Sequence, residues 1–164
     1  MPDGCRDHDL YCMEDILQRC TLGHLAMWAD EELYVVPINY AYAQGKVLFH
    51  CALTGRKLDM MASNPQVCLE VSQQSGEITQ HAGDNCSDGF ESVICWGTAR
   101  CVEDLEERAA VLSAFQRRYE TPNRYIKPIS VERASKCAAV EVTVTRMTGR
   151  RKGPAGHEQW NWGA

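Results

Sequence analysis

The feature that most constrains this fold is a run of alternating side chains between Leu33 and Val71. Residues 33–38 alternate with a period of two and are apolar on both faces, which predicts a β-strand. Lys46–Ala52 alternates in the same way and is the predicted hairpin partner. Gln44-Gly45 marks the turn between the two, because glycine readily adopts the positive φ that a tight hairpin needs. The stretch therefore predicts an antiparallel sheet.

A pair of cations opens the short helix predicted next. With Thr54 as N-cap, Arg56 and Lys57 occupy the first turn, where backbone N–H groups and the helix dipole already favour an anion. A solvated basic turn is one interpretation. A bound phosphate is the other, since it would accept hydrogen bonds from backbone, guanidinium and ammonium together. The pair follows a strand that reaches His50 and precedes a helix closed by Asn64-Pro65, and this placement favours the phosphate.

Several short motifs follow one another along the chain. They are Val36-Pro37-Ile38-Asn39-Tyr40, Phe49-His50, Gly55-Arg56-Lys57 and Asn64-Pro65-Gln66-Val67, followed by Glu91-Ser92-Val93 and Gly97-Thr98-Ala99. No single motif is specific, but the ordered set resembles the pyridoxamine-phosphate-oxidase-like flavin-binding split barrels. The likeness is strongest to the branch related to nitroimidazole-resistance proteins, and it covers residues 21–151.

The resemblance implies a mainly β fold with peripheral helices, a six-stranded antiparallel split β-barrel. It also implies a homodimer that holds flavin mononucleotide (FMN) at the subunit interface. Arg56 and Lys57 would neutralise the phosphate, with the Ser92 hydroxyl nearby unless that hydroxyl pairs within the strand ladder. The implied cofactor-binding residues are Val36, Pro37, Ile38, Asn39, Phe49, His50, Cys51, Arg56, Lys57 and Ser92.

The leading functional hypothesis is an FMN-dependent oxidoreductase that reduces a small nitro-aromatic or quinone-like acceptor. His50 is the candidate catalytic proton donor, or else a wall of the flavin pocket. No Gly-x-Gly-x-x-Gly fingerprint follows a strand, so NAD(P)H would bind only transiently. The alternative is a non-catalytic protein that stores or senses flavin, or binds haem through His50 or His24. Action on a vitamin-B6 phosphate is disfavoured because the sequence shows no second basic cluster for another phosphate.

The composition of the chain limits its domain count and the partners it can have. A chain of 164 residues with 45% hydrophobic content can bury the core of one domain, and a net charge of −5 argues against general nucleic-acid binding. No apolar run is long enough to span a bilayer and residues 1–4 do not resemble a signal peptide, so we expect a cytoplasmic protein without a membrane partner. The nine cysteines form no C-x-x-C pair, so neither a metal site nor a disulfide framework is expected.

The sequence divides into an N-terminal segment (1–20), the flavin-binding domain (21–149) and a C-terminal tail (150–164). Apolar residues from Met13 to Cys20 predict a helix of about two turns. The polar stretch 72–89, which contains His81, is a predicted long connection that could cover a ligand. The tail carries Trp160 and Trp162, which are unfavourable when exposed. Two alternatives stay open: a disordered tail, or one that docks on its own domain or a partner and stacks an indole near the flavin.

Two further elements are expected after the long connection. Residues 90–102 predict a strand long enough to bend, with Gly97 as a candidate bulge. Asp104 with Glu107 forms a predicted capping box for a structural helix ending near Tyr119. The alternating valines of 137–145 predict the strand that closes the sheet.

Overall fold

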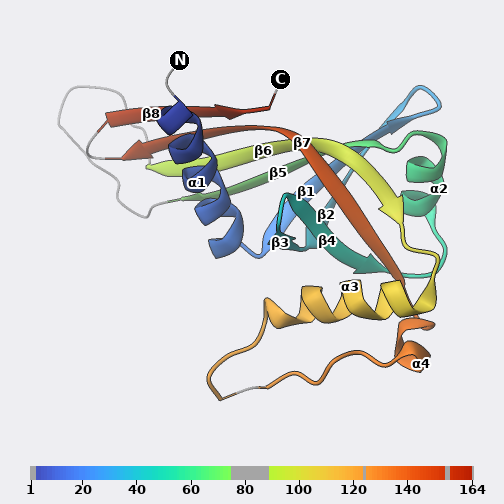
Figure 1. Cartoon of the computed structure of the whole chain (residues 1–164). Coiled ribbons are helices and arrows are strands. Elements are labelled where there is room, and N and C mark those ends of the chain that lie inside the picture. Colours follow the sequence, from blue (N-terminus) through green and yellow to red (C-terminus); the bar gives the residue numbers. More distant parts are fainter. Residues whose placement is uncertain (1–2, 75–88, 124, 154–155, 164) are drawn as a thin grey trace.

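The computed structural model describes residues 3–74, 89–123, 125–153 and 156–163. They form one antiparallel sheet with helices around it (Figure 1). The strands are β1 (Leu22–Ala29), β2 (Glu32–Asn39), β3 (Ala41–Ala43), β4 (Lys46–Cys51), β5 (Gln66–Gln74), β6 (Phe90–Cys101), β7 (Ala138–Gly153) and β8 (Gly156–Trp162). The helices are α1 (Asp3–Arg19), α2 (Arg56–Ser63), α3 (Leu105–Arg117) and α4 (Val131–Ala134).

The strand order is β2-β1-β5-β6-β7-β4-β3, with β8 added beside β7. Among the described residues no ladder joins β2 to β3, so the barrel stays open between these two strands. The predicted split-barrel class is confirmed, but the described sheet has eight strands where six were expected. The additions are β3, which is only three residues long, and β8, whose sequence is too polar and glycine-flanked to signal a strand.

The predicted turn at Gln44-Gly45 is confirmed, but the predicted pairing of residues 33–38 with β4 across this turn was wrong. Gln44 and Gly45 have φ of 53° and 74°, as a tight hairpin turn requires, and they join β4 to β3. The strand at residues 33–38 instead pairs with β1, across a turn in which Asp30 and Glu31 also have positive φ. The hairpin partner was misassigned because the strand that precedes the turn, β3, has only three residues, too few to show an alternating pattern of its own.

Helices cover the sheet on two sides. In Figure 1, α1 lies beside β8, while α3 and α4 lie along the side where β4 ends and β7 begins. Helix α1 has 17 residues, far longer than predicted, and it buries Met13, Ile16 and Leu17 completely. Helix α3 is capped by Asp104, whose carboxylate accepts a hydrogen bond from the Glu107 N–H at 2.8 Å. Among the described residues no helix is long and apolar enough to cross a membrane.

The C-terminal segment belongs to the sheet. Strand β7 continues past the predicted end at residue 145 to Gly153, and β8 pairs with it. Trp160 is only 3% exposed, and the Arg151 guanidinium lies 5.0 Å from its ring centroid. The expectation that the tail docks on its own domain is confirmed. Of the long connection, residues 72–74 complete β5, whereas His81 lies outside the described residues.

Candidate functional site

The first part of the candidate site is the entry to α2. Its N-cap is Gly55, not the predicted Thr54, with φ 137° and ψ 163°. This φ is costly for a residue with a side chain, which explains why glycine occupies the cap. Among the residues that the structure describes, no side chain caps the helix, and no heavy atom lies within 4 Å of where a Cβ of residue 55 would stand, so the space beside Gly55 is open. The first-turn N–H groups therefore lack the side-chain acceptor that usually satisfies them.

The two predicted cations lie at this entry and contact two different strands. The Arg56 guanidinium pairs with the Glu32 carboxylate of β2 and lies 4.7 Å from the ring centroid of Tyr34. The Lys57 ammonium lies 5.6 Å from the ring centroid of Phe49, which is completely buried on β4. The residues Glu32 and Arg56 are both half exposed, so their ion pair contributes little and another anion can replace it.

The Lys57 charge also acts on the end of β4. Burial raises the pKa of the Cys51 thiol, and the positive Lys57 side chain partly opposes that rise. The structure therefore places three of the predicted cofactor-binding residues near one another: Phe49, Cys51 and Lys57. His50, between the two strand residues, points to the opposite face of β4 and is exposed.

The predicted residues of β2 divide between the two faces of their strand. Val36 and Ile38 are half-buried and buried, whereas Pro37 and Asn39 are exposed beside β1. Ser92 is not near the basic pair within one chain. It lies on β6 seven residues before Ala99, whose N–H bonds the Pro65 carbonyl just after α2. Seven strand residues span about 23 Å.

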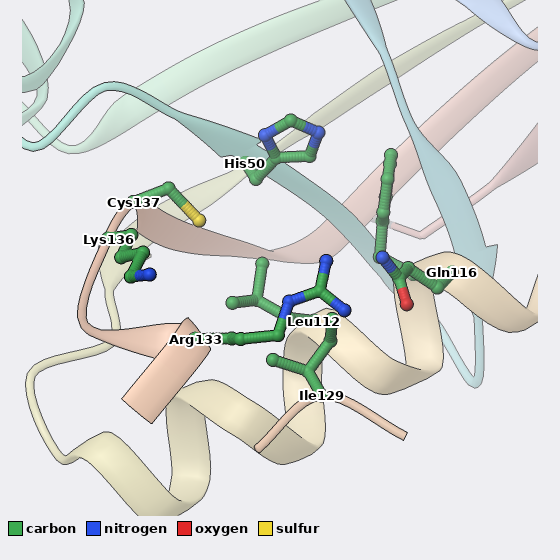
Figure 2. A pocket seen from close by; sticks show the side chains of 8 residues that line it. His50, Leu112, Gln116, Ile129, Arg133, Lys136 and Cys137 are labelled. Atoms are coloured by element: carbon green, nitrogen blue, oxygen red, sulfur yellow. The ribbon is translucent and has the colours of Figure 1, made fainter. Parts of the chain in front are cut away.

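A second part of the site, which the sequence did not predict, surrounds His50. The imidazole meets the Phe115 ring edge-on, with centroids 5.0 Å apart and planes at 84°. Beside it lies a cavity of about 250 Å³ between β4, α3 and α4 (Figure 2). The lining residues are His50, Leu112, Phe115, Gln116, Ile129, Arg133, Lys136 and Cys137. Helix α3, which was predicted to be purely structural, thus contributes three of the lining side chains.

No local pattern could have revealed this cavity. Arg133 and Lys136 sit three residues apart in and just after a four-residue helix, which looks like a solvated surface turn in the sequence. They reach His50 only because β7 begins beside β4, with His50 opposite Ala139. A site formed where strands distant in the chain pair with each other produces no periodic pattern in the sequence.

His24 occupies a third place, on the exposed face of β1. Its Nδ1 lies 3.1 Å from the Glu70 carboxylate on β5, and both side chains are more than one-third exposed. Within the described ranges, no group of three or more His, Cys, Asp or Glu residues is arranged to hold a metal ion.

The open antiparallel sheet, with a basic helix entry beside its strand ends, defines a split-barrel protein. The sequence profile of the pyridoxamine 5'-phosphate oxidase family matches residues 12–151, and the chain belongs to this family. An uncharacterised protein of Rhizobium meliloti is 40% identical over 52 residues, which span 32% of this chain and 34% of that protein.

Solved structures support the same fold. A candidate 5-nitroimidazole antibiotic resistance protein of Bacteroides thetaiotaomicron has a TM-score of 0.73 at 25% identity, over 92% of this chain and 85% of that one. A protein of Mycobacterium smegmatis described as FAD-binding has a TM-score of 0.57 at 28% identity, over 86% and 94%. The flavocytochrome Anf3 of Azotobacter vinelandii, at 17% identity and a TM-score of 0.74 over 94% and 78%, shows the fold alone.

Proposed function

We propose that this chain binds FMN and is a flavin-dependent oxidoreductase for a small acceptor. The observation that carries the proposal is the entry to α2, an uncapped helix N-terminus with two adjacent cations and open space beside its glycine cap. Such a terminus is suited to an anion. Family membership supports the choice of a flavin, as does the 28% identity to a protein described as FAD-binding.

The donor set at α2 fits one phosphate monoester. The N–H groups of Arg56 and Lys57, the Lys57 ammonium and the Arg56 guanidinium amount to one helix end and two positive charges. The two cations balance the two negative charges of a terminal phosphate, and one helix end offers N–H donors to one phosphate group, which favours FMN over the two linked phosphates of a dinucleotide. Arg56 would then exchange the Glu32 carboxylate for the phosphate.

A bound flavin would supply the electron transfer, from transiently bound NAD(P)H to a nitro-aromatic or quinone-like acceptor. The protein itself would orient the flavin ring and supply a proton to the acceptor. The backbone of β2 and β4 would border the ring with directional hydrogen bonds, and the exposed His50 imidazole would deliver a proton to the reduced acceptor. The proposal predicts that a reduced nicotinamide bleaches the yellow protein, and that the acceptor restores the colour.

We also propose that the chain acts as a homodimer with the flavin at the interface. The outer face of β1 and β2 exposes apolar side chains: Leu33 is 71% exposed, Val35 57% and Trp28 48%. Trp28 and Leu33 lie directly opposite each other in the ladder, so they form one patch rather than scattered contacts. A second copy of this chain would cover the patch, and could bring its own Ser92 to the cofactor.

The decisive experiment changes the charge of Lys57. Lys57→Glu replaces attraction by repulsion next to the phosphate, and we expect flavin per protein chain to fall more than tenfold. Lys127→Glu makes the same charge change in an exposed loop and should retain the cofactor. The measurement is the ratio of flavin absorbance to protein absorbance after purification. Full occupancy in the Lys57 variant would contradict the phosphate assignment.

A second candidate function is a non-catalytic flavin or haem binder, and one contact favours haem at His24. The Glu70 carboxylate holds Nδ1 of this imidazole and leaves Nε2 available, an arrangement typical of metal-ligating histidines. This candidate predicts a Soret band that His24→Ala removes and His50→Ala does not. A yellow protein without that band, and with nicotinamide-dependent bleaching, would exclude it.

A further inference from the structure

The cavity beside His50 combines an apolar wall with unpaired positive charge. Leu112, Phe115 and Ile129 supply the wall. At about 250 Å³ the cavity is smaller than the roughly 300–1,000 Å³ of pockets that hold drug-sized ligands. Its size and walls therefore suit a ligand with a single flat ring.

The positive charge in the cavity has no acidic partner among the described residues. None of the lining residues is Asp or Glu, and in the described part of the chain neither Arg133 nor Lys136 forms an ion pair. Figure 2 shows the Arg133 guanidinium pointing into the cavity, between the side chains of Leu112 and Gln116. A guanidinium facing an apolar wall without a carboxylate favours an anionic ligand, and its planar fork matches a carboxylate.

The cavity is held in shape by hydrogen bonds around it. The Ser113 hydroxyl donates to the Ala109 carbonyl at 2.7 Å and accepts from the Ile129 N–H at 2.8 Å, which fixes the segment before α4 against α3. Ser130 caps α4 by accepting from the Arg133 N–H at 3.3 Å. Arg133 thus projects from a fixed backbone, which lowers the entropy cost of binding.

One polar group in the wall lacks a partner. The Oε1 atom of Gln116 is buried and accepts no hydrogen bond from the described residues. A buried acceptor left unsatisfied costs free energy, which a ligand or water that donates to it would recover. An ionised carboxylate has no hydrogen to donate to this oxygen, so the contact would come from a water or from a donor group elsewhere on the ligand.

We propose that this cavity, the acid pocket, binds a small organic carboxylate with one flat apolar ring. The carboxylate lies against the Arg133 guanidinium, Lys136 adds attraction at the rim, and the ring packs on Leu112 and Phe115. Binding here requires no flavin. The acid pocket shares His50 with the proposed function, and the proposal made here concerns binding alone.

Calorimetry on the full chain tests the acid pocket with benzoate, its neutral analogue benzamide, and inorganic phosphate. We expect benzoate to bind at least about tenfold more tightly than either of the others, since only benzoate meets both the charge and the wall. Arg133→Gln should weaken benzoate binding by a similar factor. Arg117→Gln, the same change at an exposed position of α3 outside the cavity, should not.

Three outcomes would overturn the proposal. Equal binding of benzamide would show that charge plays no part, equal binding of phosphate would show a simple anion site, and an unaffected Arg133→Gln variant would place the ligand elsewhere. Flavin content measured on the same samples separates this proposal from the proposed function. Arg133→Gln should keep its flavin, and Lys57→Glu should keep its affinity for benzoate.

Discussion

At the scale of single residues, Gly97 is a position with no room for a side chain. The β6–β7 register shifts between Trp96 and Gly97, so the candidate bulge is confirmed. A Cβ at residue 97 would lie 2.3 Å from the Thr143 carbonyl oxygen, a backbone atom that cannot turn aside. Beside the bulge, the Arg146 guanidinium stacks 3.7 Å from the Trp96 ring centroid. The bulge thus requires glycine for close approach rather than for an unusual φ.

Gly97→Ala should therefore destabilise the fold. Relieving the clash requires β6 and β7 to separate, which we expect to cost about 1–3 kcal/mol, as for overpacked cores. Gly153→Ala is the matched control, because no heavy atom lies within 4 Å of its added Cβ. Urea unfolding of both variants gives the free energies. If they are equal, the two strands can separate more easily than the geometry implies.

At the scale of elements, Glu91 joins α1 to the sheet. Its carboxylate accepts two hydrogen bonds from the Arg19 guanidinium, at 2.7 and 3.0 Å, and one from Arg151 of β7 at 3.2 Å. Gln73 of β5 donates to the same carboxylate. The hydrogen bond from Arg19 is the largest cause that lowers the pKa of Glu91 to about 2, although partial burial opposes it.

This carboxylate predicts a specific loss of stability in acid. The pKa of Glu91 is lower in the folded chain than in the unfolded one, so its contribution is complete above about pH 4.5 and disappears as the pH falls towards 2. The free energy of unfolding of the native protein should fall more steeply across this window than that of Glu91→Gln. Denaturant titrations from pH 6 to 2 measure both slopes.

A control for the acid prediction is available in Glu107. Its carboxylate pairs with Arg100, but this ion pair is exposed to solvent, so Glu107→Gln should leave the slope almost unchanged. Parallel pH profiles for the native protein and Glu91→Gln would mean that the contacts of Glu91 contribute nothing to folding.

At the scale of the whole molecule, the apolar patch on β1 and β2 is exposed to solvent in the single chain. Replacing Leu33 and Val35 together by lysine puts two charges into the proposed dimer contact, and we expect a monomer that also loses flavin. Leu105→Lys, an exposed apolar position on α3, should remain dimeric. Light scattering coupled to size exclusion gives the mass. A dimer that survives the double substitution would place the interface elsewhere.

The sequence by itself determined the local features of this protein. Period-two alternation identified the main strands, Gln44-Gly45 the turn, Asp104 the helix cap and Gly97 the bulge, because each depends on residues close in the chain. Its ordered motifs also identified the family, and it placed Arg56 and Lys57 at the α2 entry.

Only the tertiary structure decided which strands pair and which side chains this pairing brings together. It assigned β2 to β1 rather than to β4, buried Trp160 by adding β8 to the sheet, and placed Arg133 and Lys136 beside His50. The strands β1 and β2, like β7 and β8, are neighbours in the chain, whereas Arg133 and Lys136 are distant from His50. In all three cases the free energy comes from buried surface and paired strands. Neither quantity is a property of any local stretch of sequence, so the sequence left the docking of the tail as one of two alternatives and revealed neither the partner of β2 nor the cavity.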